Sequence, residues 1–212
     1  MTVVNFIIDS DFKNSLPAAK MNNLNPIIFL VPVIALLLAS LLYFSLLKRE
    51  TDKKTFNGFV FAVTVLAFLL NFTWELVQMP LYKNSSFSID HVAFCALGSI
   101  ADAIMVLLLY FGLAFIFKNP LWIQHLTWQR IVIVILIGGT GGILGEIRHL
   151  SLGSWAYDDS MPIIPFVNAG VSPVLQFMIL PLLIYVLGLY YLKIRRKKRN
   201  EEHDESNYNS SF

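Results

Sequence analysis

The sequence predicts an all-α fold: a polytopic membrane helical bundle with five transmembrane helices, its N-terminus outside and its C-terminus in the cytoplasm. The first observation is composition: the 212 residues are 56% hydrophobic and 14% charged, with a mean hydropathy of +0.64. About a quarter of the residues in a soluble domain are charged. The second observation is a set of five apolar stretches near or above the roughly 20 residues that span a bilayer. The third is that Lys and Arg gather after the first, third and fifth stretches. A soluble enzyme, a nucleic-acid-binding protein and a disordered chain are therefore excluded.

We expect each apolar stretch to be a helix, because an open sheet edge or a bare loop in lipid would leave backbone groups without partners. The predicted spans are residues 27–47, 58–80, 92–117, 131–150 and 174–192. They divide the chain into an N-terminal extracytoplasmic segment (1–25), a five-helix transmembrane domain (26–194) and a basic, then acidic cytoplasmic tail (195–212). The tail is expected to be disordered from residue 200. The first span is expected to be an uncleaved anchor, and Met21 is an alternative start site.

The basic residues set the predicted orientation. Of the 16 Lys and Arg residues, twelve follow the first, third and fifth spans, and four lie on the opposite side. The positive-inside rule then places the C-terminus in the cytoplasm, and five spans place the N-terminus outside. The expected location is the inner (plasma) membrane. The expected partners are membrane lipids, whose headgroups the basic run at 193–199 would contact, and not nucleic acid.

Polar side chains inside a span are costly and usually face the bundle interior, so each is a candidate for function. In the second span Asn71, Glu75 and Gln78 are spaced i, i+4, i+7 and share one helical face, with Trp74 beside them. Gln176 lies near the start of the fifth span. We expect these side chains to face a common interior.

The third and fourth spans carry matching groups. His91, Cys95 and Asp102 form one stripe on the third span, and Glu146 and His149 are i, i+3 neighbours on the fourth. A rise of about 1.5 Å per residue places the polar groups of all these helices in the outer half of the membrane or at its midplane. The sequence therefore predicts a polar pocket that opens outward or toward lipid.

The connection at 151–173 is not merely hydrophilic. Trp155 and Tyr157 precede a stretch that mixes prolines with bulky apolar residues. Aromatic residues at this level commonly anchor a chain at the membrane interface. The same composition suits a segment folded back as a lid over the mouth of the bundle. Both interpretations remain open.

The fourth span is rich in glycine. It contains two overlapping small-xxx-small pairs, Gly138 with Gly142 and Gly141 with Gly145, and also Gly139. Such glycines let helix backbones approach closely. We expect them to serve helix packing.

Three carboxyl groups in an apolar surround are suited to acid–base chemistry. Glu75, Asp102 and Glu146 are therefore the candidate catalytic residues, because a neutral carboxylic acid could protonate an alkene or a leaving group of a lipid substrate. The same groups could relay protons or bind a cation in a transporter. They could also only fix helix packing, with Glu75 or Glu146 paired to Arg148 and Asp102 hydrogen-bonded to Asn71.

A metal site is a further hypothesis, although no cofactor is identified. Glu146-x-x-His149 places two potential ligands on one helix face, as in di-iron bundles, which repeat the motif on a second helix. His91 and Cys95 at i, i+4 could add two more ligands. The candidate substrate-binding residues are Asn71, Trp74, Gln78, Trp155, Tyr157 and Gln176.

The string from Asn71 to Tyr82, NFTWELVQMPLY, resembles the WExxQxPLY signature of a group of small bacterial multipass membrane proteins without assigned function. The resemblance extends over roughly residues 68–182. It includes His91, Cys95 and Asp102, then Glu146, Trp155-x-Tyr157, Met161-Pro162 and Pro173-x-x-Gln176. It implies a membrane bundle and no particular activity.

A second likeness concerns Glu146 through Tyr157, which looks like the membrane domains of carotenoid lycopene cyclases and hydratases. Those cyclases continue with Pro-x-Glu-Glu, whereas this chain has Pro173-Val174-Leu175-Gln176. The likeness implies a related helical architecture.

Three classes of function are left: an enzyme acting on a lipid or isoprenoid-like substrate, a small transporter or ion-handling protein, and a non-catalytic membrane assembly protein. Five helices without an evident internal repeat count against the common inverted-repeat transporters.

Overall fold

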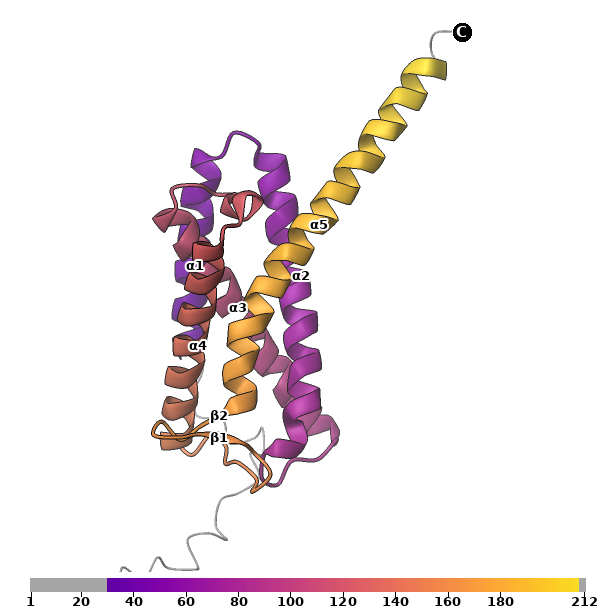
Figure 1. Ribbon diagram of the computed structural model, residues 1–212. Coiled ribbons are helices and arrows are strands. Elements are labelled where there is room, and N and C mark those ends of the chain that lie inside the picture. The colour runs from indigo at the N-terminus through magenta and orange to yellow at the C-terminus, as the bar shows by residue number, and fades with distance from the viewer. Residues whose placement is uncertain (1–29, 210–212) are drawn as a thin grey trace, which may run out of the picture.

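The computed structural model describes residues 30–209, which form long helices joined at one end by a short hairpin (Figure 1). The elements are α1 (Leu30–Arg49), α2 (Lys53–Gln78), η3 (Met79–Leu81), α3 (Ile89–Ile116), η4 (Trp122–His125), α4 (Trp128–Ser151), β1 (Ile163–Ile164), β2 (Ala169–Gly170) and α5 (Val171–Asn209). The two strands pair antiparallel, with Ile163 opposite Gly170. The predicted N-terminal segment 1–25 lies outside the described residues.

Five helices in the described chain are long and apolar enough to cross a membrane, which confirms the predicted number. Several begin before the predicted span because polar residues cap them. Asp52 Oδ1 accepts a hydrogen bond from the Thr55 amide at 3.0 Å at the start of α2. The Ser88 hydroxyl accepts one from the His91 amide at 3.4 Å at the start of α3. Each cap satisfies a backbone N–H that the first helical turn cannot pair.

α5 differs most from expectation. It continues to Asn209, so the prediction of a disordered tail is wrong for residues 200–209. Lys, Arg and Glu, which dominate the segment after the span, are good helix formers. Lys197 and Glu201 also lie 3.8 Å apart at i, i+4, a spacing that stabilises a helix.

The helices form a bundle that α5 crosses obliquely. α5 begins beside the hairpin, packs against α4 and α2, and projects beyond the opposite end of the bundle (Figure 1). α1 packs mainly on α3. The start of α5 is therefore held between α2 and α4, where the polar residues of the spans were expected.

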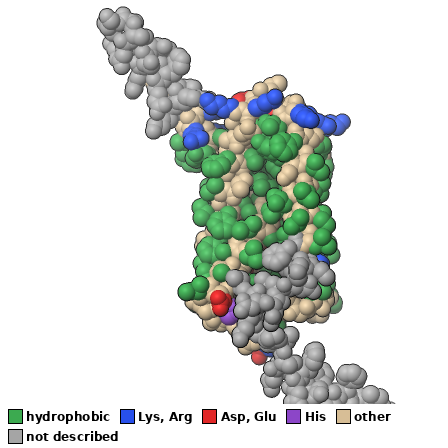
Figure 2. Space-filling view, turned by 180° about the vertical axis from the view of Figure 1, so that it is seen from behind, with side chains coloured by type: hydrophobic (Ala, Val, Ile, Leu, Met, Phe, Trp, Pro, Cys, Tyr) green, Lys and Arg blue, Asp and Glu red, His purple; other side chains and the backbone are tan. Residues whose placement is uncertain are grey.

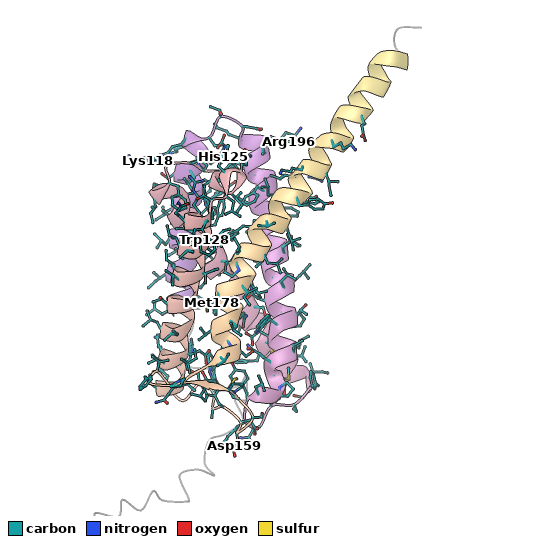
Figure 3. The ribbon with its side chains drawn as sticks, viewed as in Figure 1. Lys118, His125, Trp128, Asp159, Met178 and Arg196 are labelled. Carbon is teal, nitrogen blue, oxygen red and sulfur yellow. The ribbon has the colours of Figure 1, made fainter. Side chains whose placement is uncertain are left out.

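The surface has the pattern of a protein solvated by lipid. Hydrophobic side chains cover the middle of the face in Figure 2, and Lys and Arg gather at one end. Large apolar side chains are exposed on the spanning helices, including Leu41 (69%), Val77 (75%) and Leu136 (62%). An apolar surface this extensive is unusual on a soluble monomer. Lys118, His125 and Arg196 lie at the end opposite Asp159 (Figure 3).

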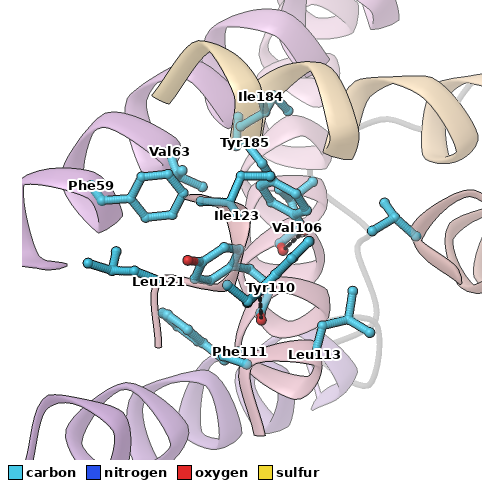
Figure 4. Close-up of a cluster of buried hydrophobic side chains, with 14 of the residues drawn as sticks. Phe59, Val63, Val106, Tyr110, Phe111, Leu113, Leu121, Ile123, Ile184 and Tyr185 are labelled. Atoms are coloured by element: carbon cyan, nitrogen blue, oxygen red, sulfur yellow. Dashed lines mark hydrogen bonds between the residues drawn. The ribbon is translucent and has the colours of Figure 1, made fainter. Parts of the chain in front are cut away.

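Figure 4 shows part of the buried core, including Tyr110 and Tyr185. These two side chains form an aromatic cluster with Trp122 of η4, the element that also contains His125 at the basic end. Tyr110, Trp122 and Tyr185 are fully buried, with ring centroids 5.1 to 5.9 Å apart. Each polar tip is satisfied, as buried Tyr and Trp require. Tyr110 donates to the Pro120 carbonyl at 2.7 Å, Tyr185 to the Val106 carbonyl at 2.7 Å, and Trp122 to the Tyr110 carbonyl at 3.3 Å.

The glycines of α4 act in packing, although only some of them. A Cβ on Gly138 would collide with the Phe177 carbonyl of α5, one on Gly139 would meet Met178 at 2.9 Å, and one on Gly142 would meet Phe177 at 3.3 Å. Gly141 and Gly145 would meet nothing within 4 Å, so the predicted Gly141–Gly145 pair makes no contact in the described chain. A helix has only one face toward a given neighbour, and these two glycines lie off it.

Replacing Gly138 by Ala should destabilise the bundle, because the added methyl group has no room beside the Phe177 carbonyl. We expect Gly138→Ala to lower the free energy of unfolding by about 1–3 kcal/mol. Gly141→Ala is the matched control, with an expected gain of up to about 1 kcal/mol from helix propensity. Unfolding of the purified chain in detergent by added SDS measures both. Equal stabilities of the two variants would contradict the α4–α5 contact.

Candidate intramembrane carboxylate site

The polar face of α2 packs against Gln176 of α5. Gln78 donates from Nε2 to Glu75 Oε1 at 2.9 Å and to Gln176 Oε1 at 3.1 Å. Gln176 is 1% exposed and donates from Nε2 to Asn71 Oδ1 at 2.9 Å. Asn71, Glu75 and Gln78 can all belong to this network because the i, i+4, i+7 spacing points them to the same side of the helix.

The same amide group of Gln176 reaches α3, where it donates to Asp102 Oδ2 at 3.2 Å. One buried side chain therefore joins α2, α3 and α5. The network continues in both directions: Ser172 Oγ donates to Gln78 Oε1 at 2.9 Å, and Asn71 Nδ2 donates to the Ala67 carbonyl at 2.7 Å. Both amide hydrogens of each glutamine are used, so the orientation of each amide is fixed by its partners.

Two of the contacts expected for a pure packing role are absent from the described chain. Asp102 does not bond Asn71 directly. The amide nitrogen of Asn71 donates to the Ala67 carbonyl, so Asn71 offers its Oδ1 to the network. Asn71 Oδ1 and Asp102 Oδ2 both act as acceptors here, and Nε2 of Gln176 donates to both. Arg148 is exposed and forms no ion pair with Glu75 or Glu146 among the described residues. Residues 146 and 148 point to different sides of α4, because i, i+2 neighbours do not face each other.

Glu146 is held by the loop that follows its own helix. It is 7% exposed, and its Oε2 accepts hydrogen bonds from Trp155 Nε1 at 3.2 Å and from the Tyr157 hydroxyl. The Tyr157 oxygen in turn accepts from the Gly170 amide of β2 at 2.8 Å. The loop therefore folds back onto the bundle through two aromatic donors, and the hairpin holds one of them in place.

Tyr82 connects the α2 network with the Glu146 loop. Its ring centroid lies 6.2 Å from that of Trp155 and 5.7 Å from that of Tyr157. Backbone bonds tie the same segments: the Asp158 amide donates to the Leu81 carbonyl and the Lys83 amide to the Ala156 carbonyl, both at 2.9 Å. The two parts of the site therefore share one aromatic wall.

Burial raises the pKa of the Tyr82 phenol far above its ordinary value, and the carboxylates of Glu146, Glu75 and Asp102 raise it further. The pKa of Tyr157 is also raised, by burial and by its hydrogen bond to Glu146. Both phenols therefore keep their protons at neutral pH and act as donors.

Each of the three carboxyl groups is held by one oxygen only within the described chain. The bonds end on Oε1 of Glu75, Oδ2 of Asp102 and Oε2 of Glu146. Among the described side chains, the one buried polar atom without a partner is Nε1 of Trp74, next to Glu75 on α2. The second carboxyl oxygens are therefore not enclosed by the described residues, and a buried indole N–H is left to donate.

The four candidate metal ligands do not come together. Among the described residues, no group of three or more His, Cys, Asp or Glu side chains is arranged to hold a metal ion. His91 Nδ1 lies 2.9 Å from the Ser86 hydroxyl, and Cys95 is a free thiol. His149 stacks on Trp155 at 4.4 Å and lies 3.3 Å from the Ser154 hydroxyl.

Three contributors were not among the predicted site residues. Tyr82 stands at the end of the PLY string, and its place after a helix-ending proline was a usable signal for a side chain at the site. Ser172 donates to Gln78, and Gly170 positions Tyr157 through its backbone amide. Nothing in the sequence marks these two, because Gly170 acts through its place in the hairpin and Ser172 through the position of the first turn of α5.

Replacing Gln176 by Leu should destabilise the protein, because it leaves acceptor oxygens of Asn71 and Asp102 without their donor. The expected loss in the free energy of unfolding is about 1–3 kcal/mol. Gln129→Leu, at an exposed position of α4, is the matched control and is expected to change little. Thermal unfolding in detergent provides the measurement. A Gln176→Leu protein as stable as the control would show that the network does not hold the helices.

No family model matches the chain, and neither a curated protein nor a solved structure matches it. The likeness to the WExxQxPLY proteins and to carotenoid cyclase domains stays a prediction. The site is therefore defined by its own contacts.

Proposed function

We propose that the protein is a multipass membrane enzyme in which Glu75, Asp102 and Glu146 carry out acid–base chemistry on a lipid or isoprenoid-like substrate. One observation carries this proposal. Carboxyl groups from three helices are held at one end of the bundle: Gln78 and Gln176 link Glu75 to Asp102, and Glu146 is held by Trp155 and Tyr157, whose rings pack against Tyr82. Each group is fixed by one oxygen and has the other unpaired within the described chain. Such an arrangement suits proton transfer, since the bound oxygen orients the group and the second can give or take a proton.

The surroundings support a largely apolar substrate. Trp155 donates to Glu146, and Tyr82 packs against Trp155, so both supply aromatic surface at this site. Aromatic faces suit alkenes and developing positive charge. The buried Trp74 N–H without a partner would donate to a polar group at the end of the substrate. In the proposed step one carboxylic acid protonates an alkene, or protonates a leaving group whose bond to carbon then breaks. A carboxylate of the same site takes a proton from the resulting carbocation, which forms a new double bond in the product. The likeness to carotenoid-modifying domains favours an isoprenoid as the substrate class.

The proposal includes an orientation. With the basic end in the cytoplasm, the C-terminus is inside, the N-terminus is outside, and the site lies in the outer half of the inner (plasma) membrane. The separation of Lys118 and Arg196 from Asp159 supports this assignment (Figure 3).

A second candidate is a non-catalytic assembly protein, in which the network only fixes the helices. The complete use of both glutamine amides favours it, because Gln78 and Gln176 keep no hydrogen for a ligand. The two candidates differ in one respect: an assembly role needs Gln176, whereas catalysis also needs ionisable groups at 75, 102 and 146.

Substituting Glu75→Gln, Asp102→Asn and Glu146→Gln singly removes proton transfer and retains a hydrogen-bond acceptor. We expect each variant to lower turnover by about 10²–10⁴-fold, the usual contribution of a general acid or base. The readout is mass spectrometry of lipid extracts from cells that express each variant, compared with cells that lack the gene. Asp159→Asn, an exposed acid at the same end, is the control. If all three variants fold and cause the same change in lipid composition as the unsubstituted protein, the packing role stands and the catalytic proposal falls.

Reporter fusions test the orientation separately. A reporter that is active only in the cytoplasm should be active after residue 209 and inactive when inserted at Asn84, in the exposed loop between η3 and α3. The opposite pattern would reverse the assigned sides. As a control that a reporter inserted in a loop can be active, the same reporter is inserted after Lys118, in the loop at the basic end, where activity is expected.

A further inference from the structure

A cavity of about 240 Å³ lies far from the carboxyl groups, at the basic end of the bundle. It is bounded by the start of α2, by η4 and by the part of α5 that leaves the bundle. Figure 3 shows His125 and Arg196 at this end. The lining residues are Thr55, Gln124, His125, Leu189, Leu192, Lys193 and Arg196. The space is far larger than the roughly 10–15 Å³ that a cavity needs to hold one water molecule.

The lining is divided by polarity. Leu189 and Leu192 supply an apolar wall, and Leu192 is only 7% exposed. Lys193, Arg196 and the hydrogen-bonding side chain of Gln124 supply the polar part, and all three are exposed. Among the residues that the structure describes, no Asp or Glu lines the cavity.

The carboxylate of Asp52 holds Arg196 in place. Arg196 Nη2 donates to Asp52 Oδ2 at 2.8 Å and to Thr55 Oγ1 at 2.6 Å. Hydrogen bonds from Thr55, together with the charge of Arg196, keep the pKa of Asp52 below its ordinary value, so this acid is ionised at neutral pH. Its charge offsets one of the two cations. Lys193 is left as excess positive charge, and the bonds of Arg196 to Asp52 and Thr55 use only one of its nitrogens, Nη2.

We propose that this cavity binds the phosphate headgroup of an anionic membrane phospholipid. Lys193 and Arg196 would contact the phosphate, Gln124 would hydrogen-bond the headgroup, and the two leucines would cover the start of the acyl chains. A basic pocket between helices on one side of a membrane is suited to anionic headgroups. The leucine wall distinguishes this ligand from a free phosphate ion, which would gain nothing from it. The site is independent of the acid–base chemistry proposed above.

Native mass spectrometry of the purified full chain in detergent tests the proposal, with phosphatidylglycerol, phosphatidylcholine and inorganic phosphate as separate probes. We expect phosphatidylglycerol to bind with the highest affinity. Lys193→Gln should weaken that binding about fivefold, the usual effect of one basic residue near an anionic surface. Lys197→Gln is the matched control, because it removes the same charge one turn further along α5, where Lys197 faces Glu201 at 3.8 Å and not the cavity.

Leu189→Phe adds a second test without changing charge. The larger side chain fills the cavity and should reduce phosphatidylglycerol binding at least as much as Lys193→Gln does. Lys193 is exposed, so its variant keeps the proposal testable if Leu189→Phe does not fold. Equal effects of Lys193→Gln and Lys197→Gln would show a diffuse basic surface and overturn the site. Binding of inorganic phosphate or phosphatidylcholine as tight as that of phosphatidylglycerol would overturn the assignment of the ligand.

Discussion

Gln176 is an amide buried in a helix that crosses lipid, where no water is at hand to pair with an unused N–H or C=O. Leaving such a group unpaired costs free energy, so its partners must come from neighbouring helices. Gln78, Asn71 and Asp102 are those partners, and they lie on α2 and α3. The relative positions of α2, α3 and α5 at this level therefore follow from the hydrogen-bonding needs of one side chain. The positions of α4, of the loop after it and of the aromatic cluster can be described by how they support this network around Gln176.

The glycines of α4 bring a fourth helix to the same place. Gly138 and Gly142 allow α4 to approach α5 at Phe177, the residue directly after Gln176. This approach places Glu146, two turns along α4 from Gly138, at the end where the loop and hairpin fold back. Trp155 and Tyr157 then satisfy its carboxylate. The other end of the bundle is packed by Tyr110, Trp122 and Tyr185, so the polar groups are confined to one half of the spans.

The sequence predicted the features that depend on spacing along one helix. The number of spans and the shared face of Asn71, Glu75 and Gln78 follow from hydrophobicity and the helical repeat, and both are found in the structure. The sequence did not reveal which helices face each other. The bridge from Gln176 to Asp102 and the empty space beside Gly141 both depend on how one helix is rotated relative to its neighbour. The continuation of α5 was missed because a charged composition was interpreted as disorder, although those residues also favour helix.

The central claim is that the amides of Gln78 and Gln176 couple α2 to α5 at the level of the carboxyl groups. A double-mutant cycle with Gln78→Leu, Gln176→Leu and the combined variant measures this coupling directly, as free energies of unfolding in detergent. The structure predicts an interaction energy of about 0.5–2 kcal/mol between the two positions, the range for contacting polar side chains in membrane bundles. Effects that add to within about 0.3 kcal/mol would mean that the two side chains act independently, and would contradict the claim.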